Sequence, residues 1–111
     1  DPVYASNRGF DDNWVIRRNQ PHELALAGYI YEPKSGRKME VLTTQPGVQI
    51  YAANWVEKQT GKYGKEYDAQ CAICLETQGF PASPAYPHFP SPVLRPGEKY
   101  DEWCIYKFSA E

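Results

Sequence analysis

The sequence lacks the long apolar segments and the charge excess that identify several classes of protein. No run approaches the ~18 consecutive apolar residues that a membrane helix needs, and no signal-peptide pattern is present. The formal net charge is −2. Proteins that bind nucleic acid or anionic membranes present a basic face, so we expect neither a nucleic acid nor a membrane as partner.

Cysteine is also scarce, with only Cys71, Cys74 and Cys104. An odd number makes a poor disulfide framework, so we expect free thiols and a reducing compartment, the cytoplasm. The spacing "CAIC" is compatible with a metal or redox site. However, strand positions three apart face opposite sides, so the two sulfurs would diverge, and no second such pair exists. The pattern therefore does not favour a zinc site.

Motifs of common catalytic chemistry are missing as well. The chain has no phosphate-binding loop, no HExxH and no Ser-His-Asp order. Its two histidines, His22 and His88, lie in proline-flanked segments. The pattern does not favour either as a general acid.

What the sequence does have is period-two alternation, whereas no segment keeps a helical period for three turns. "EPKSGRK" is typical of a hairpin turn in which Gly36 takes a positive φ. Six of the ten prolines fall in residues 80–97, which excludes regular strand pairing there, and the polar residues 57–68 predict a surface loop. The predicted strands are residues 13–18, 22–33, 37–44, 47–54, 69–77 and 98–109. The predicted fold class is antiparallel all-β.

Alternation also predicts which side chains share a face of each strand. In the first long strand, Leu24, Leu26 and Ile30 are expected on one side. In the strand that returns from the hairpin, Met39 and Val41 are expected together.

An acidic residue, Glu76, interrupts the apolar stretch "CLETQGFP". On a strand it would share a face with Ala72 and Cys74, whose small side chains would leave room for a ligand. They would also partly desolvate the carboxylate, as suits a general base. The alternative from pattern alone is a strand-end glutamate that leans into solvent or pairs with a lysine.

Two further polar residues are candidates for binding a ligand. Gln49 and Tyr51 would present an amide and an aromatic ring on one face, and such groups bind sugar hydroxyls and C–H patches. An outward polar residue on a half-exposed strand is the alternative. Asp11 belongs to a run of Asp, Asp and Asn that commonly marks a turn or cap. A second of these residues could still accept a hydroxyl, but the oxygens are too few for a calcium loop.

Four stretches in order resemble the C-terminal part of the aldose 1-epimerase, or galactose mutarotase, family. They are "GFDDNW", "SGRKMEVLTTQPGVQIYAANW", "CLETQGFP" and "FPSPVLRPGEKYDEWCIYKFS", and they cover nearly the whole chain. The resemblance implies a large antiparallel β-sandwich with an open sugar cleft on one sheet. It also implies interconversion of the α and β anomers of aldohexoses such as galactose and glucose, without a metal or organic cofactor.

The resemblance further assigns roles to residues of the matching motifs. It implies that Glu76, in "LETQ", is the base that removes the proton from the anomeric hydroxyl, and that Asp11 and Gln49 bind the sugar. Gln45 would be structural. The family's general-acid histidine and a sugar-binding arginine lie upstream of all four motifs, so neither role passes to a residue of this chain.

Two positions depart from the family pattern. Asp12 stands where the family usually has histidine, which could alter pairing near the sugar. The chain has "YAAN", with Ala52 and Ala53, where the family commonly has "YTGN". This second change removes a hydroxyl and a flexible glycine, and we expect it to be the milder one.

Because the family sandwich is more than twice this size, we expect residues 1–111 to be the C-terminal part of a single sandwich domain. An apolar flank would then be exposed, and the upstream part of the same protein is the expected partner beside the monosaccharide. Alone, the chain should be inactive or nearly so.

Two other functions stay open at this point. One is a non-catalytic carbohydrate-binding or interaction module on the same scaffold. The other is an epimerase of hexose 6-phosphates, which needs a basic phosphate pocket. Arg17 and Arg18 stand on opposite sides of the predicted strand and would make a poor clamp.

Overall fold

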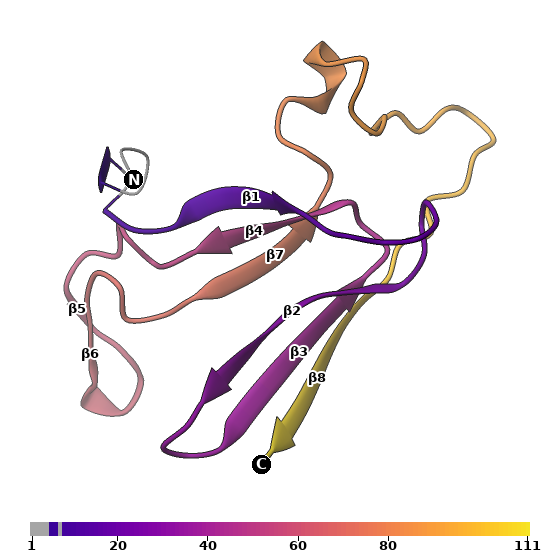
Figure 1. Ribbon diagram of the computed structural model, residues 1–111. Coiled ribbons are helices and arrows are strands. Elements are labelled where there is room, and N and C mark those ends of the chain that lie inside the picture. The colour runs from indigo at the N-terminus through magenta and orange to yellow at the C-terminus, as the bar shows by residue number, and fades with distance from the viewer. Residues whose placement is uncertain (1–4, 7) are drawn as a thin grey trace. The chain divides into compact units, whose positions relative to one another are not determined.

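The computed structural model describes residues 5–6 and 8–111, and their regular structure is almost entirely β (Figure 1). The predicted all-β class is confirmed. The described residues form β1 (Asp11–Val15), β2 (Ala25–Glu32), β3 (Arg37–Thr43), β4 (Gly47–Tyr51), β5 (Gln59–Thr60), β6 (Glu66–Tyr67), β7 (Cys74–Gln78) and β8 (Cys104–Ala110). Two short 3-10 helices, η1 (Lys62–Gly64) and η2 (Ser83–Ala85), accompany them. Among the described residues, no helix has the length and apolar character needed to cross a membrane.

The chain divides into two compact units. The first contains the chain up to Trp14 together with Gln49–Glu76, and the second contains Val15–Val48 and Thr77–Glu111. That both belong to one sandwich domain stays a prediction.

The second unit is built on a three-stranded sheet in the order β2-β3-β8, with both pairs antiparallel. On the central strand β3, Val41 is fully buried and Met39 is half-buried, and the two lie on one face as predicted. Large apolar side chains remain exposed on the outer strands, among them Tyr29 and Phe108, the latter 75% exposed. An exposed apolar flank was expected from the sequence.

The face assignment of the first long strand is wrong. The pairing of β2 with β3 shifts between Leu26 and Gly28, so one extra residue is inserted there. Such a bulge exchanges the two faces of the strand beyond it. As a result, Leu26 pairs opposite Leu42, whereas Ile30 pairs opposite Met39 and lies on the other face.

A second sheet has the order β1-β4-β7. Figure 1 draws the arrow of β4 opposite to those of β1 and β7, so this sheet is also antiparallel. β1 begins at Asp11 and includes Asp12 and Asn13, so the interpretation of this run as a turn is wrong. Pairing with a neighbouring strand here overrides the local turn preference of Asp and Asn.

Several strand boundaries also differ from prediction. β7 begins only at Cys74 and β8 only at Cys104. The exposed residues 57–68 contain the small β5-β6 hairpin around η1 rather than an irregular loop. In the proline-rich residues 80–97 the structure has no strand, as predicted, and one turn of 3-10 helix.

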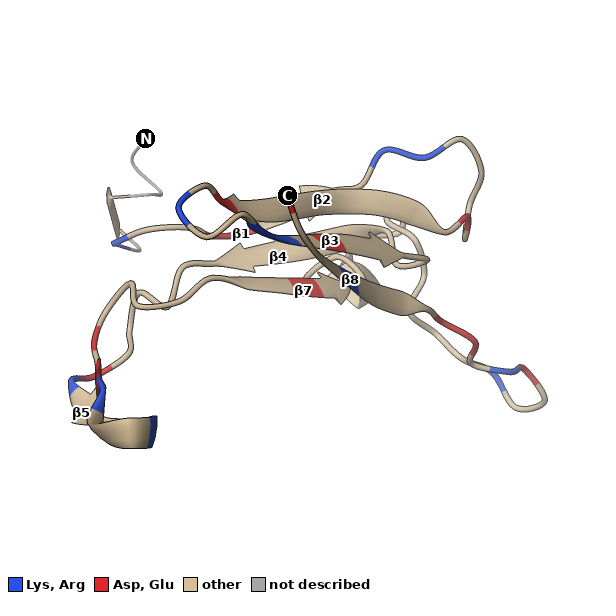
Figure 2. Ribbon diagram, turned by 90° about the horizontal axis from the view of Figure 1, so that it is seen from below, with Lys and Arg blue, Asp and Glu red and all other residues tan. Residues whose placement is uncertain are grey.

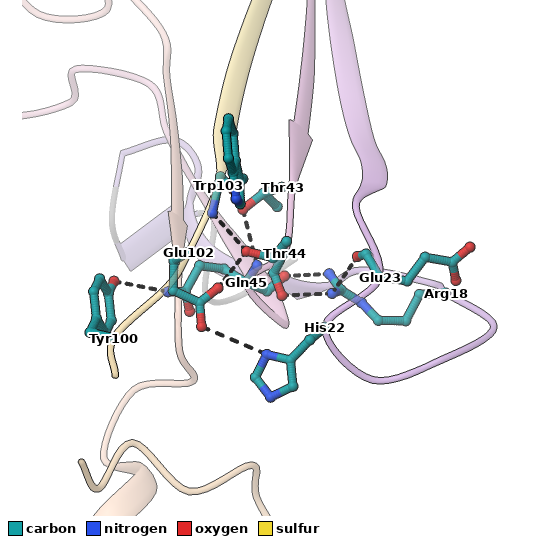
Figure 3. A network of polar contacts seen from close by, with 9 residues as sticks. All are labelled: Arg18, His22, Glu23, Thr43, Thr44, Gln45, Tyr100, Glu102 and Trp103. Carbon is teal, nitrogen blue, oxygen red and sulfur yellow. Dashed lines mark hydrogen bonds and ion pairs between the residues drawn. The ribbon is translucent and has the colours of Figure 1, made fainter. Parts of the chain in front are cut away.

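A polar network joins the end of β3 to the segments on either side of it in the second unit (Figure 3). The Arg18 guanidinium donates to the backbone carbonyls of Glu23 at 3.0 Å and Thr44 at 2.7 Å, and also to that of Gln45. The Gln45 side chain donates to the Tyr100 hydroxyl at 3.3 Å. These contacts support the expected structural role of Gln45.

The β2-β3 hairpin should depend strictly on glycine at its turn. Gly36 has φ +70°, and a Cβ there would lie 2.1 Å from the backbone oxygen of Glu111. We expect Gly36→Ala to lower the free energy of unfolding by more than the ~1–2 kcal/mol of the left-handed conformation alone, because the contact adds to it. Urea unfolding with Gly64→Ala as control, which has φ +71° and nothing within 4 Å, measures the difference. Equal losses would contradict the role of the contact.

The same turn should make stability depend on pH. Hydrogen bonds from the Ser35 side chain, and next from the Lys34 backbone, hold the pKa of Glu32 below its ordinary 4.5. A carboxyl whose folded pKa is depressed stabilises the fold above its unfolded pKa, and this contribution is lost as pH falls through the folded value. NMR titration should show the depressed pKa, and Ser35→Ala should move it back up. An unchanged pKa in that variant would contradict the assignment.

Candidate functional site

Two of the three predicted site residues are in direct contact in the first unit. Gln49 on β4 donates from Nε2 to Oδ1 of Asp11 on β1 at 2.9 Å, and both side chains are half-buried. Only one acceptor oxygen of Asp11 is used in this bond, and a carboxylate has further lone pairs. The pair can therefore bind a hydroxyl while remaining joined.

The third predicted residue, Glu76, is on β7, the other neighbour of β4. It is the one acidic residue of that strand and is seen as the red segment of β7 in Figure 2. Glu76 is exposed, so the expected partial desolvation by this chain is wrong. No lysine forms a salt bridge with it among the described residues.

The departures from the family pattern have visible consequences around this site. Oδ2 of Asp12 accepts a long hydrogen bond of 3.4 Å from the backbone N–H of Asp11. Ala53 has φ +51°, a left-handed conformation that suits glycine better than alanine. Ala53 thus introduces backbone strain shortly after β4 ends at Tyr51, and that this departure is the milder of the two stays a prediction.

Sequence reasoning missed one residue next to these, Asn54. Its side chain is 1% exposed and donates from Nδ2 to the carbonyl oxygen of Phe10 at 2.9 Å. No local sequence pattern signals this burial, because it depends on the contact with Phe10, far away along the chain.

One hollow of this unit does not contain the predicted site residues. It is an open cavity of about 410 Å³. Its lining residues are Gly9, Phe10, Ala52, Gln70, Cys71, Ala72 and Ile73. Asp11 follows this lining directly in sequence but is not part of it.

Neither histidine is built into an acid site. His22 has a side chain 79% exposed, with Nδ1 3.7 Å from Oε1 of Glu102 (Figure 3). His88 contacts the rings of Phe89 and Tyr86 with centroid separations of 4.5 and 5.9 Å. Both belong to the second unit.

The chemistry of the site is that of oxygen ligands without a metal cluster. The part of the chain that the structure describes contains no group of three or more His, Cys, Asp or Glu that could hold a metal ion. Cys71, Cys74 and Cys104 are free, as expected. The groups that remain are the carboxylate–amide pair of Asp11 and Gln49 and the carboxylate of Glu76 on β7.

Comparisons with known proteins identify the family. The family model described as aldose 1-epimerase matches residues 2–107. The chain belongs to the aldose 1-epimerase family. It is 41% identical over 102 residues to galactose mutarotase of Bos taurus, and 27% identical over 106 residues to aldose 1-epimerase of Escherichia coli. A solved GalM/aldose epimerase homologue from C. elegans is similar with a TM-score of 0.73 and 33% identity.

The matches cover nearly all of this chain but only part of each relative. They include 91% of this chain for the bovine protein and 94% for the bacterial one, and 91% for the C. elegans structure. The chain spans 29% of the bovine protein and 30% of the other two. Family membership and the mutarotase type of fold are thereby established. The activities in the relatives' names are those of proteins longer than this chain.

The contact between Asp11 and Gln49 predicts a pH-dependent defect in one variant. Gln49→Glu replaces the donor by a second carboxylate, so we expect a loss of about 1–3 kcal/mol in the free energy of unfolding at neutral pH. The loss should shrink near about pH 4, where one carboxyl becomes protonated and can donate. Urea unfolding at both values, with Gln49→Met as the uncharged control, measures this. A loss independent of pH would contradict the contact.

Proposed function

We propose that this chain supplies the base and two sugar-binding groups of an aldose 1-epimerase that interconverts the α and β anomers of aldohexoses, galactose and glucose among them. The observation that carries this proposal is the placement of Asp11, Gln49 and Glu76 on three neighbouring strands of one sheet in a chain of this family. Asp11 and Gln49 hold sugar hydroxyls, and Glu76 is the proton acceptor.

The proposed reaction moves protons and one C–O bond. Glu76 takes the proton of the anomeric hydroxyl, the anomeric oxygen forms a carbonyl with C1, and the bond from C1 to the ring oxygen breaks. The ring oxygen receives a proton from a general acid. Rotation about C1–C2 and reversal of the steps give the other anomer, with no net change in atoms or electrons.

We propose that the acid comes from a part of the complete enzyme outside this chain, since the chain spans only 29% of the bovine relative. His22 is engaged with Glu102, and His88 is packed among aromatic rings, which supports leaving both out of the role. We therefore infer that the isolated chain is inactive. The complete enzyme for the tests below is a chimaera in which this chain replaces the matching part of bovine galactose mutarotase.

One structural observation weighs against the hexose 6-phosphate alternative. The Arg18 guanidinium is used by three backbone carbonyls, so it does not provide a phosphate clamp. The non-catalytic sugar-binding module remains a distinct outcome of the test below.

Replacing the base should abolish turnover and leave binding. In the complete enzyme, Glu76→Gln keeps the shape of the side chain and removes the proton acceptor, so we expect the rate of galactose mutarotation to fall about 10²–10⁴-fold. Polarimetry measures the rate and calorimetric titration measures binding. The control is Glu66→Gln, which removes another exposed carboxylate of the same unit and should leave the rate unchanged.

The outcomes separate the candidate functions. Unchanged kinetics in Glu76→Gln would overturn the role of this residue. A complete enzyme that binds galactose without changing its anomer would support the binding module instead.

A further inference from the structure

The peptide group that precedes Asp11 is held by two hydrogen bonds from the end of β4. The backbone N–H of Ala52 donates to the Phe10 carbonyl oxygen at 3.0 Å, and Nδ2 of Asn54 donates to the same oxygen at 2.9 Å. A carbonyl oxygen has two lone pairs, and both are used here. The plane of the Phe10–Asp11 peptide is therefore fixed, and with it the direction in which the Asp11 side chain leaves the backbone.

The amide of Asn54 is closely confined in this position. The residue is 1% exposed, and its Oδ1 atom has no hydrogen-bond partner among the described residues. A Cβ on Gly9 would lie 2.2 Å from Oδ1 and 2.9 Å from Cγ of Asn54. Only glycine at position 9 leaves room for the Asn54 amide. Gly9 thus allows the hydrogen bond by which Asn54 holds the Phe10–Asp11 peptide.

Asp11 is thus held at two points. Its backbone is fixed through Phe10 by Asn54, and its carboxylate is fixed by Gln49 at 2.9 Å. If either restraint is lost, the Asp11 carboxylate becomes more mobile in the free protein. Binding of a hydroxyl must then immobilise it, and the entropy lost in doing so weakens binding.

We propose that Asn54 is a positioning residue for sugar binding, which acts through the Phe10–Asp11 peptide on the Asp11 carboxylate. The inference rests on the proposed function, in which Asp11 binds a sugar hydroxyl. In this inference Asn54 does not contact the sugar itself. It affects the affinity for the sugar by holding Asp11 in position.

The test is a double-mutant cycle in the complete enzyme. Asn54→Ala should raise KM for galactose about five- to tenfold while kcat stays within about twofold, since the defect is in binding. In an Asp11→Ala background the same substitution should have almost no further effect on KM, because the group through which it acts is gone. Polarimetric rates over a range of galactose concentrations give both constants.

A matched control is provided by Gln70, whose side-chain amide donates to the carbonyl oxygen of Arg8, further from Asp11 along the chain. Gln70→Ala removes the same kind of bond and should leave KM within about twofold. Thermal unfolding of each variant records the loss of stability separately. If Asn54→Ala does not fold, Asn54→Ser gives the same comparison, because its shorter side chain cannot span the distance to Phe10.

Two results would overturn the inference. One is a lower melting temperature with unchanged KM, which makes Asn54 purely structural. The other is an equal rise in KM with and without the Asp11 carboxylate. The Glu76→Gln variant distinguishes failure of this inference from failure of the proposed function. If Glu76→Gln loses turnover, the proposed function stands and only the role of Asn54 is wrong. If Glu76→Gln is fully active, the proposed function itself is wrong.

Discussion

The position of β4 between β1 and β7 is the constraint on which the candidate site depends. Adjacent strands lie about 4.8 Å apart, so pairing alone brings together side chains that are widely separated along the chain. Asp11, Gln49 and Glu76 come from three strands that are distant in sequence and consecutive in this sheet.

The environments of Asp11 and Glu76 in this sheet differ, and the difference suits the proposed chemistry. Asp11 is half-buried and joined to Gln49, as a group that recognises a hydroxyl must be held in place. Glu76 is exposed and makes no ion pair among the described residues.

Sequence patterns predicted the features that depend on neighbouring residues. The all-β class, the hairpin with a left-handed Gly36, the shared face of Met39 and Val41, and the absence of strands among the prolines are all confirmed. The resemblance to the family named the site residues, and the structure brought Asp11 and Gln49 into contact.

What could not be predicted depends on contacts between distant segments. The bulge between Leu26 and Gly28 is set by the pairing of β2 with β3, and alternation within one strand cannot show it. The inclusion of Asp11 in a strand results from its neighbour β4, against the local preference for a turn. The burial of Asn54 beneath Phe10 joins residues 44 positions apart, and no local pattern contains that information.

The most direct measurement is the structure of the complete enzyme with galactose bound. The account predicts that a carboxylate oxygen of Glu76 lies within about 2.6–3.2 Å of the anomeric hydroxyl oxygen, with Asp11 and Gln49 in contact with other hydroxyls of the same sugar. Galactose bound away from the β1-β4-β7 sheet, or bound on it with Glu76 out of reach of the anomeric oxygen, would contradict the account.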